Sequence, residues 1–257
     1  MTHECSASFR PRWPIRHVLF DFDGTLSLVR AGWAEVMTEM FMGLLPGADR
    51  GFVADGIMAL NGKATIHQMD WLAVQRRDRG LPAGMGADYL AEFLRRLQRV
   101  IDERLAGDRE KLLVTGARAL LEMLTERGLT LHIASGTDEP AVRREAEALG
   151  IAHFFGGRIH GARADALGFS KTEIIAAILR DYDCPGAGLL SFGDGHIETE
   201  NTKRVGGLAV AVASDEDEPG SGRIDEGKRA RLLAAGADVV IADYRNADAL
   251  LEILIAP

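Results

Sequence analysis

Residues 17–25 read HVLFDFDGT, a short apolar run that ends in two aspartates, a glycine and a threonine. An apolar run of this kind, followed by turn residues, predicts a buried strand that enters a turn. Similar short runs occupy residues 129–134, 188–192, 208–213 and 237–241, and segments with helical periodicity separate them. Strands that alternate with helices indicate an α/β fold with a parallel sheet covered on both faces.

The segments between these runs carry the stop signals of helices. Gly128, Gly150 and Gly236 each follow a segment with helical periodicity, and glycine is common just after the end of a helix. The helices that we expect in this part of the chain cover residues 117–127, 139–149, 171–180, 197–205 and 225–234.

The segment from residue 28 to residue 112 has a different pattern, because strand-like runs disappear from it. Apolar side chains in residues 33–45 and 90–101 follow the i, i+3, i+4, i+7 spacing of an amphipathic helix, and weaker patterns cover residues 52–60 and 64–79. Acidic and basic side chains nearly balance here, so nearly all of the net charge belongs to the rest of the chain. We expect three parts, which are a flexible N-terminal tail at 1–14, an α/β core at 15–27 and 113–257, and an all-helical domain at 28–112.

Composition and charge disfavour several classes of protein. The 257 residues include 30 Lys and Arg against 38 Asp and Glu, a formal charge of -8, which disfavours nucleic acid as a partner. The two cysteines, Cys5 and Cys184, indicate neither a disulfide framework nor a zinc site, so we expect a reducing, cytoplasmic location. The sequence shows neither a signal-peptide pattern nor an apolar run of the roughly 18 to 20 residues that span a membrane, so no membrane partner is expected.

The strongest chemical feature is the pair of aspartates at the end of the first run, Asp21 and Asp23. Open parallel sheets place their ligand crevices at the carboxyl ends of strands, and alternation directs both side chains to the same side. Two carboxylates this close are stabilised by a divalent cation between them or by a proton on one of them. Aspartate before glycine is also common in turns, so the pair by itself is equally compatible with a structural turn.

A second acidic pair lies in SFGDGHIETE, residues 191–200, again between an apolar run and a helical segment. Glu198 is four residues after Asp194 and therefore lies on the same face of a helix. Together the two carboxylates suit an oxygen-ligand site for Mg²⁺. The alternative is structural, with Asp194 as the N-cap of the helix.

Two further residues suit an anion. Ser135 follows the second predicted core strand, and Gly136 and Thr137 lead from it toward a helix. A hydroxyl beside the N–H groups of a helix N-terminus suits an anion, and a simple N-cap is the alternative. Lys171 begins a predicted helix, where a cation opposes the helix dipole, which indicates either a functional partner or an ordinary solvated lysine.

Taken in order, these features resemble the haloacid dehalogenase superfamily phosphatases, in particular the phosphoglycolate phosphatase-like and β-phosphoglucomutase-like members. The resemblance rests on DFDGT at residues 21–25, the Ser135 motif, Lys171, and GDGHIE at residues 193–198. It spans nearly the whole chain and implies a Rossmann-like, doubly wound parallel sheet with a helical cap domain inserted between the first and second motifs. The departure is Glu198, where many relatives carry aspartate, which leaves both direct and water-mediated ligation of a metal open.

The resemblance implies a mechanism of phosphoryl transfer. Asp21 would be the nucleophile that forms an aspartyl-phosphate, and Asp23 would be the acid and base, a role that requires a carboxyl group that keeps its proton near neutral pH. The Mg²⁺ cofactor would be held by Asp21, Asp194 and the backbone carbonyl of Asp23, with Glu198 direct or through water. The implied phosphate-binding set comprises Ser135, Lys171 and backbone N–H groups near Gly24, Thr25 and Gly136.

The resemblance also implies that the helical cap closes over the site and contacts the leaving group. The expected substrate contacts are Arg30, which follows the first motif, and Lys63 and His67, which share one helix face at i and i+4. A solvated surface is the alternative for each of them. The expected substrate is a small phosphorylated metabolite, such as a sugar phosphate or a phosphoglycolate-like monoester, and the chain is expected to be a monomer or a homodimer.

Related activities are distinguished by single residues. Asp23 argues against a dehalogenase, since a halide leaving group needs no proton. A phosphonate-cleaving enzyme would require a Schiff-base lysine in the cap, for which Lys63 is available, but Asp23 suits ester chemistry better. A Mg²⁺-dependent phosphatase is therefore the favoured function, with a phosphomutase of the β-phosphoglucomutase type and a non-catalytic binding module on the same fold as the alternatives.

Overall fold

The computed structural model describes residues 3–12, 14–60, 65–162 and 170–255. Within these residues, seven strands form one sheet in the order β1-β7-β6-β5-β2-β3-β4. Neighbouring strands are parallel, except that β1 pairs antiparallel with β7. The strands are β1 (His3–Cys5), β2 (His17–Phe20), β3 (Thr130–Asp138), β4 (Ile159–Ala162), β5 (Leu189–Gly193), β6 (Leu208–Val212) and β7 (Val239–Ile241).

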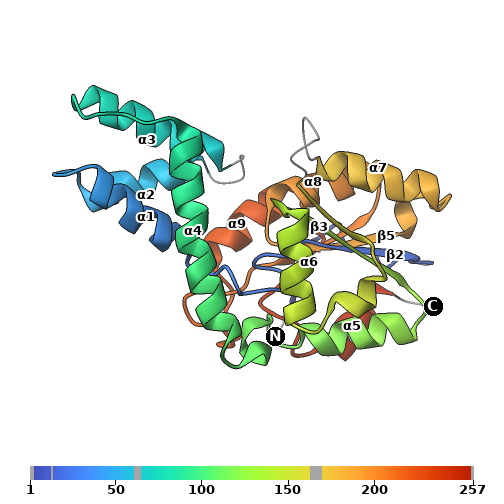
Figure 1. Ribbon diagram of the computed structural model, residues 1–257. Helices are drawn as coiled ribbons and strands as arrows, with labels where there is room; N and C mark the ends of the chain where they lie inside the picture. Colours follow the sequence, from blue (N-terminus) through green and yellow to red (C-terminus); the bar gives the residue numbers. More distant parts are fainter. Residues whose placement is uncertain (1–2, 13, 61–64, 163–169, 256–257) are drawn as a thin grey trace. The chain divides into compact units, whose positions relative to one another are not determined.

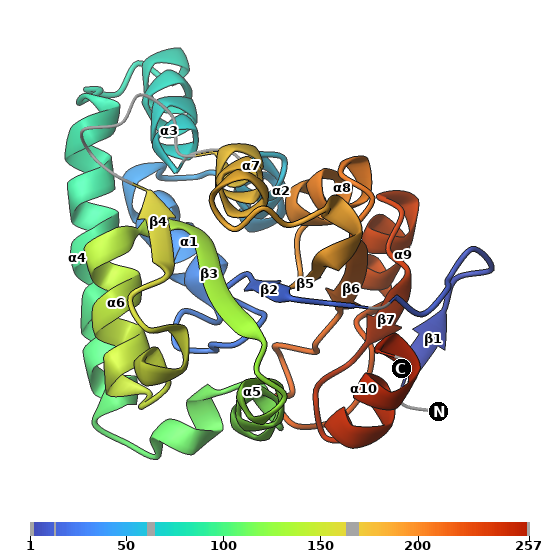
Figure 2. The ribbon, with the colours of Figure 1, turned by 90° about the vertical axis from the view of Figure 1, so that its right-hand side faces the viewer.

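Helices cover both faces of this sheet (Figures 1 and 2). They are α5 (Ala117–Glu126), α6 (Glu139–Ala148), α7 (Lys171–Asp181), α8 (His196–Arg204), α9 (Glu226–Ala234) and α10 (Ala247–Leu254), with short 3-10 turns η1 (Arg109–Leu112), η2 (Ala152–Phe155) and η3 (Gly186–Gly188). α7 and α8 pack together on one face, and α5 and α10 pack together on the other. The predicted α/β fold with a doubly wound, predominantly parallel sheet is confirmed.

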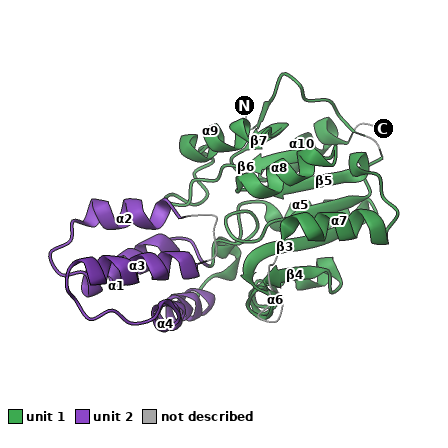
Figure 3. Cartoon of the chain, turned by 90° about the horizontal axis from the view of Figure 1, so that it is seen from above, with its two compact units in different colours: residues 1–29, 107–257 green, residues 30–106 purple. Residues whose placement is uncertain are grey.

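The chain divides into two compact units (Figure 3). Unit 1, residues 1–29 and 107–257, contains the sheet, and unit 2 covers residues 30–106. The helices of unit 2 are α1 (Trp33–Leu44), α2 (Arg50–Met58), α3 (Ile66–Asp78) and α4 (Gly86–Leu105). Unit 2 is narrower than the predicted range of 28–112, because Leu28 N donates to Leu112 O at 2.7 Å and so ties both connecting segments to unit 1.

Residues 3–5 form an edge strand, although residues 1–14 were expected to be a flexible tail. Cys5 is in register with Val239 of β7, and the guanidinium of Arg229 donates to both carboxylate oxygens of Glu4 at 2.6 and 2.8 Å. A run of three residues is too short to show a strand period in the sequence, and its order comes from pairing with a distant strand. The expectation is therefore wrong for this part of the tail.

Three other elements differ from expectation. β3 continues to Asp138 instead of ending at Ala134, with an irregular register against β4, so Ser135 lies in a strand and not after one. β4 has no predicted counterpart, because its sequence IHGA is short and contains a glycine, which is a weak strand former. α10 also has no predicted counterpart, although Leu250, Leu251 and Leu254 are buried on one side of it.

The interior of the sheet determines where β2 ends. Phe20 of β2 stacks on Phe192 of β5 with ring centroids 5.0 Å apart. Phe155 contacts the Phe20 ring edge-on, with ring centroids 6.4 Å apart. On the face covered by α7, Leu19 packs in a cluster with Ile175. Because β2 is buried along its whole length, the polar residues that follow it emerge at the edge of the sheet.

Within the described residues, no helix has both the length and the apolar character to cross a membrane.

Candidate active site

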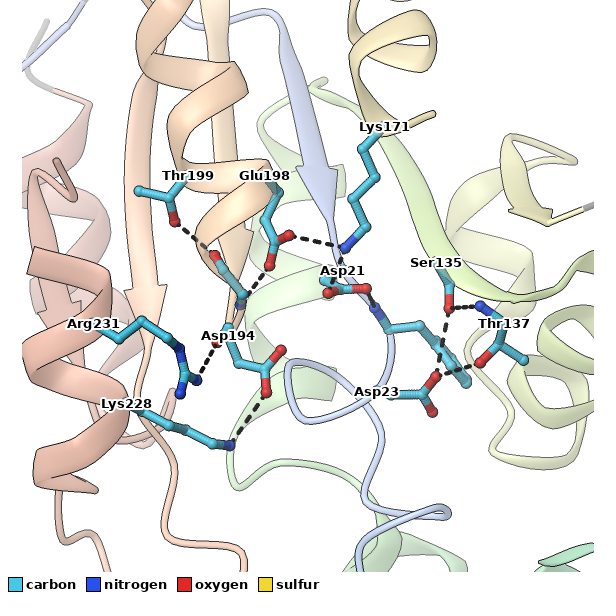
Figure 4. Close-up of polar contacts among 12 residues, drawn as sticks. Asp21, Asp23, Ser135, Thr137, Lys171, Asp194, Glu198, Thr199, Lys228 and Arg231 are labelled. Carbon is cyan, nitrogen blue, oxygen red and sulfur yellow. Dashed lines mark hydrogen bonds and ion pairs between the residues drawn. The ribbon is translucent and has the colours of Figure 1, made fainter. Parts of the chain in front are cut away.

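Neighbouring strands of unit 1 bring the predicted side chains together (Figure 4). β2 leads into Asp21 and Asp23, β5 leads into Asp194, and β3 carries Ser135. Since these strands are parallel neighbours, their carboxyl ends lie at one edge of the sheet. A bond of 2.9 Å from Asp21 N to Phe192 O extends the pairing of β2 with β5 to the first aspartate.

A tight turn fixes the DFDGT motif. Ser27 N donates to Phe22 O at 2.9 Å, and Gly24 has a φ of 72°, which glycine adopts without strain. The hydroxyl of Tyr244, which is buried, donates to Thr25 O at 3.0 Å. The turn is thus held from inside the protein, and the aspartates that flank it are fixed relative to the sheet.

The turn also uses two N–H groups that were expected to bind phosphate. Gly24 N donates to Ser27 O at 2.9 Å, and Thr25 N donates to Phe22 O at 3.4 Å. Both N–H groups therefore have partners within the turn, and their assignment to phosphate stays a prediction. The hydroxyl of Thr25, in contrast, is buried and has no hydrogen-bond partner among the described residues.

Lys171 joins two of the predicted carboxylates (Figure 4). Its Nζ lies 2.6 Å from Asp21 Oδ2 and 3.0 Å from Glu198 Oε2. The lysine is the first residue of α7, and its side chain is only 12% exposed. Two ion pairs therefore offset the unfavourable position of this cation at a helix N-terminus.

Glu198 is held by the start of its own helix. Its Oε1 accepts a bond of 2.6 Å from the N–H of Gly195, the N-cap of α8, and the residue is 4% exposed. A side chain at Gly193 or at Gly195 would collide with Glu198. The glycines on both sides of Asp194 therefore let the Glu198 carboxylate lie directly against the backbone. The N-cap of this helix is Gly195 and not Asp194.

Burial and charge act in opposite directions on these groups. Burial raises the pKa of Asp21 well above its usual value, although the Lys171 ammonium opposes this effect. Burial also acts to raise the pKa of Glu198, but its contacts with Lys171 prevail and hold that pKa below its usual value. For Lys171 itself, burial acts to lower the pKa, and the two carboxylates outweigh it and raise the pKa above its ordinary value. Its two carboxylate neighbours therefore favour the charged form of the lysine.

Asp194 has a different cationic partner. Lys228 Nζ lies 3.2 Å from Asp194 Oδ2 (Figure 4). Burial raises the pKa of Asp194 to about 6, although Lys228 opposes the shift. Burial likewise acts to lower the pKa of Lys228, and the carboxylates of Asp194 and Glu216 outweigh it and raise that pKa.

Three carboxylates form a compact oxygen cluster, which we call the carboxylate trio. One oxygen from each of Asp21, Asp194 and Glu198 lies within 4.8 Å of the others. Carboxylate oxygens are the ligands that Mg²⁺ prefers, and a divalent cation would offset the burial that disfavours the charged forms of Asp21 and Asp194. The donor set therefore fits the predicted metal.

Asp23 lies beside two hydroxyl groups of β3. Thr137 Oγ1 donates to Asp23 Oδ2 at 2.8 Å, and Ser135 Oγ lies 3.5 Å from the same oxygen. Ser135 Oγ in turn accepts from Thr137 N at 3.1 Å. The two aspartates of the motif therefore differ in these contacts, because Asp21 lies against the Lys171 ammonium and Asp23 accepts from the Thr137 hydroxyl (Figure 4). Such an asymmetry suits two different chemical roles.

The remaining predicted contacts stay predictions. Gly136 is exposed beside Ser135. Arg30 and His67 belong to unit 2, where His67 is exposed on α3. Lys63 lies outside the described residues.

Three residues of the site were not predicted, namely Thr137, Lys228 and Glu216. Thr137 lies two residues after Ser135 in β3 and therefore on the same face of the strand, so a longer predicted strand would have revealed it. Lys228 and Glu216 lie in charged segments far along the chain from Asp194. No local pattern separates them from solvated surface charges. The packing of α9 brings Lys228 to the site, and Glu216 lies in the loop that precedes this helix.

Comparison with known proteins gives a family-level result. The model of the haloacid dehalogenase-like hydrolases matches residues 15–200. This range contains the carboxylate trio together with Asp23 and Lys171. No curated protein matched the sequence.

Solved structures with the same fold come from several bacteria. A predicted phosphoglycolate phosphatase from Haemophilus somnus 129pt is 16% identical, with a TM-score of 0.65, over 92% of this chain and 97% of the other. A haloacid dehalogenase-family hydrolase from Deinococcus radiodurans R1, with bound phosphate and sodium, is 17% identical, with a TM-score of 0.64, over 95% of this chain and 99% of the other. A candidate β-phosphoglucomutase from Thermotoga maritima is 17% identical, with a TM-score of 0.62, over 93% and 100%. At these identities the likeness concerns the fold.

Proposed function

The chain belongs to the haloacid dehalogenase-like hydrolases, and on that basis we propose that it is a Mg²⁺-dependent phosphatase of a small phosphorylated metabolite, such as a sugar phosphate or a phosphoglycolate-like monoester. The observation that carries the proposal is the position of Asp21. Its carboxylate belongs to the carboxylate trio and lies 2.6 Å from the ammonium of Lys171. A carboxylate next to both a cation site and a fixed lysine is suited to attack an anionic phosphate.

In the first step, an Asp21 carboxylate oxygen attacks the phosphorus of the monoester. The bond from phosphorus to the ester oxygen breaks, and the product is an aspartyl-phosphate on Asp21. Both Asp21 oxygens are held in the structure, Oδ1 by Phe22 N at 2.7 Å and Oδ2 by Lys171. This orientation supports an in-line approach of one oxygen to a bound phosphoryl group.

Asp23 transfers the protons. In its acid form it donates a proton to the departing ester oxygen, which leaves as an alcohol. The resulting carboxylate then takes a proton from water, which attacks the phosphorus and releases inorganic phosphate with the Asp21 carboxylate restored. Thr137 at 2.8 Å holds the Asp23 carboxyl in place for both steps.

The phosphoryl oxygens need donors that keep their positions as charge moves in the transition state. Lys171 supplies a buried cation, and Ser135 supplies a neutral donor near Asp23. In this proposal Mg²⁺ would be held by Asp21, Asp194 and the backbone carbonyl of Asp23, with Glu198 direct or through water. When bound, the cation screens the anionic nucleophile from the anionic phosphate. The phosphate and sodium in the Deinococcus radiodurans hydrolase support this pairing of anion and cation.

The test is the release of inorganic phosphate from a panel of phosphorylated metabolites, with Mg²⁺ and with EDTA. We expect release that requires Mg²⁺, is at least about 10³-fold slower for Asp21→Asn, and differs among sugar phosphates and small phosphorylated acids. Circular dichroism of the variant controls for folding. Conversion of a sugar phosphate that requires a catalytic sugar bisphosphate would instead identify a phosphomutase. No turnover by a folded protein would favour a non-catalytic module.

A further inference from the structure

The acidic loop between β6 and α9 contributes to the metal end of the site. Lys228 of α9 contacts two acids at once, Asp194 Oδ2 at 3.2 Å and Glu216 Oε1 at closer range. The side chains of Lys228 and Glu216 are only 13% and 26% exposed. Glu216 lies in the segment SDEDEPGSG, residues 214–222, which as a sequence has the appearance of a solvated turn.

This loop is fastened to the turn that carries the nucleophile. Ser214 Oγ donates to Gly24 O at 3.1 Å. A Cβ added to Gly24 would collide with the Asp194 carboxylate and lie 3.1 Å from Glu216 Oε1. Both carboxylates therefore border the same glycine, and Lys228 links them. Asp225 Oδ1 accepts from Lys228 N at 2.8 Å, which fixes the start of α9 and with it the position of the lysine.

The two buried lysines of the site have parallel contacts. Lys171 bridges Asp21 and Glu198, which both belong to the carboxylate trio. Lys228 bridges one trio member, Asp194, and one acid outside the trio, Glu216. The chemistry of phosphoryl transfer assigns a task to Lys171 but none to Lys228 or Glu216.

We propose that Lys228 determines which divalent cation the carboxylate trio accepts, by holding Glu216 away from the cation as a non-ligand. The inference rests on the proposed function only in requiring that the trio binds a divalent cation. Mg²⁺ is small and takes six ligands at fixed geometry, whereas Ca²⁺ accepts up to eight oxygens in flexible arrangements. A carboxylate next to Asp194 that is released from its lysine would add oxygen ligands, and extra oxygens favour the larger cation. Lys228 thereby keeps the site selective for Mg²⁺.

The experiment measures binding of MgCl₂ and of CaCl₂ separately by isothermal titration calorimetry, without substrate. For Lys228→Met we expect Ca²⁺ affinity to rise about tenfold and Mg²⁺ affinity to rise by at most about threefold, so that selectivity for Mg²⁺ falls. Removal of a positive charge acts on both ions alike, since they carry the same charge. Only a new ligand changes the ratio of the two affinities.

Three further variants separate the ligand from the charge. Lys228→Met combined with Glu216→Gln lacks the released carboxylate, so we expect the wild-type ratio to return. Lys228→Arg keeps the cation and should also keep the ratio. Lys203→Met removes another, partly buried ion pair of unit 1, in which Nζ lies 2.6 Å from Asp238 Oδ1, and should leave the ratio unchanged. Circular dichroism of each variant in EDTA verifies folding.

The outcomes for this inference and for the proposed function are distinguishable. A folded Lys228→Met variant with the wild-type ratio, or a double variant that keeps the altered ratio, overturns the inference even if the wild type releases phosphate. An altered ratio that the double variant restores supports the inference even if the wild type releases no phosphate. A wild type that binds neither ion at millimolar concentration overturns both.

Discussion

The two ends of α7 cover two groups of buried ionisable side chains. The surroundings favour charged forms in one group and neutral forms in the other. At its N-terminus, Lys171 lies among carboxylates at the carboxyl edge of the sheet. At its C-terminus, Tyr182 covers histidines of β2 and β3. Its ring centroid lies 4.6 Å from that of His17 and 5.6 Å from that of His132. The same helix therefore spans a charged cluster and a neutral one.

The histidine cluster comprises His17, His132 and His160. His17 Nδ1 and His132 Nε2 form a hydrogen bond of 3.1 Å, and the rings of His132 and His160 stack at 6.2 Å. Burial lowers the pKa of His132 to about 3, and it also lowers the pKa of His17 and of His160. His132 Nδ1 is buried without a partner among the described residues, so a proton there would have no acceptor.

The contrast shows what a buried charge requires. Where opposite charges are adjacent, as for Lys171 and Glu198, the charged forms are favoured in the interior. Where none is adjacent, as for His132, burial makes the group neutral. Charge that is retained at a strand end is available for chemistry, which is why the proposed function lies at the Lys171 end of α7. Each of the following predictions tests one side of this contrast.

The largest expected effect is at the charged end. Lys171→Met removes the cation that pairs with Asp21 and Glu198, so transition-state charge on the phosphoryl group loses its main donor. We expect kcat/KM for the best substrate to fall about 10³-fold, which is about 4 kcal/mol. Steady-state kinetics measure it, with Lys203→Met as the control that should remain within about threefold of wild type. A fall of less than tenfold would place the functional charge elsewhere.

The second prediction concerns acid stability and belongs to the neutral end. The folded pKa of His132, about 3, lies below the unfolded value of 6.5. Between these two pH values the unfolded chain binds a proton at His132 that the folded chain does not. The contribution of His132 to the free energy of unfolding is therefore fully present above pH 6.5 and is lost as the pH falls toward 3. At pH 4 the loss is about 3 kcal/mol.

Urea unfolding at pH 7 and pH 4 measures this loss. The free energy of unfolding of the wild type should decrease by about 3 kcal/mol more than that of His132→Phe. His153→Gln changes an exposed histidine and should follow the wild type. Equal acid sensitivity of the wild type and His132→Phe would show that the cluster is not kept neutral by burial.

A smaller effect is expected for Thr137, whose neutral hydroxyl donates to the Asp23 carboxyl. Thr137→Val removes the hydroxyl that donates to Asp23 at 2.8 Å while keeping the shape of the side chain. We expect kcat to fall about tenfold, with a changed pH profile of kcat, because Asp23 loses a donor that favours its charged form. Thr137→Ser should restore most of the activity. An unchanged pH profile together with lost activity would indicate only a packing role.

The smallest effect is expected at the far end of α7. Tyr182→Leu removes the ring that covers His17 and His132, at a position that is 46% exposed. The free energy of unfolding should decrease by about 1 kcal/mol, and kcat/KM should stay within about twofold of wild type. Thermal and urea unfolding together with kinetics measure the two quantities. A large loss of activity here would contradict the separation of the two ends of α7.

The predictability of these features depends on how far apart in sequence their parts lie. Asp21 and Asp23 were predictable because a single apolar run leads into them, and Glu198 because it follows Asp194 by one helical turn. Lys228 and the histidine cluster were not, because distant elements bring each partner into contact and no short window contains both. β1 and β4 were missed for the same reason, since each is too short to show a period and is ordered by its neighbour in the sheet.

The most direct test of the account is to trap the phosphoryl group on the protein. Wild-type protein is mixed with its best substrate and Mg²⁺, quenched in acid during turnover, digested, and analysed by mass spectrometry. The account predicts a peptide containing Asp21 that has gained the mass of one phosphoryl group, sensitive to hydroxylamine and absent from Asp21→Asn. A phosphoryl group on another residue, or phosphate release by Asp21→Asn at the wild-type rate, would contradict it.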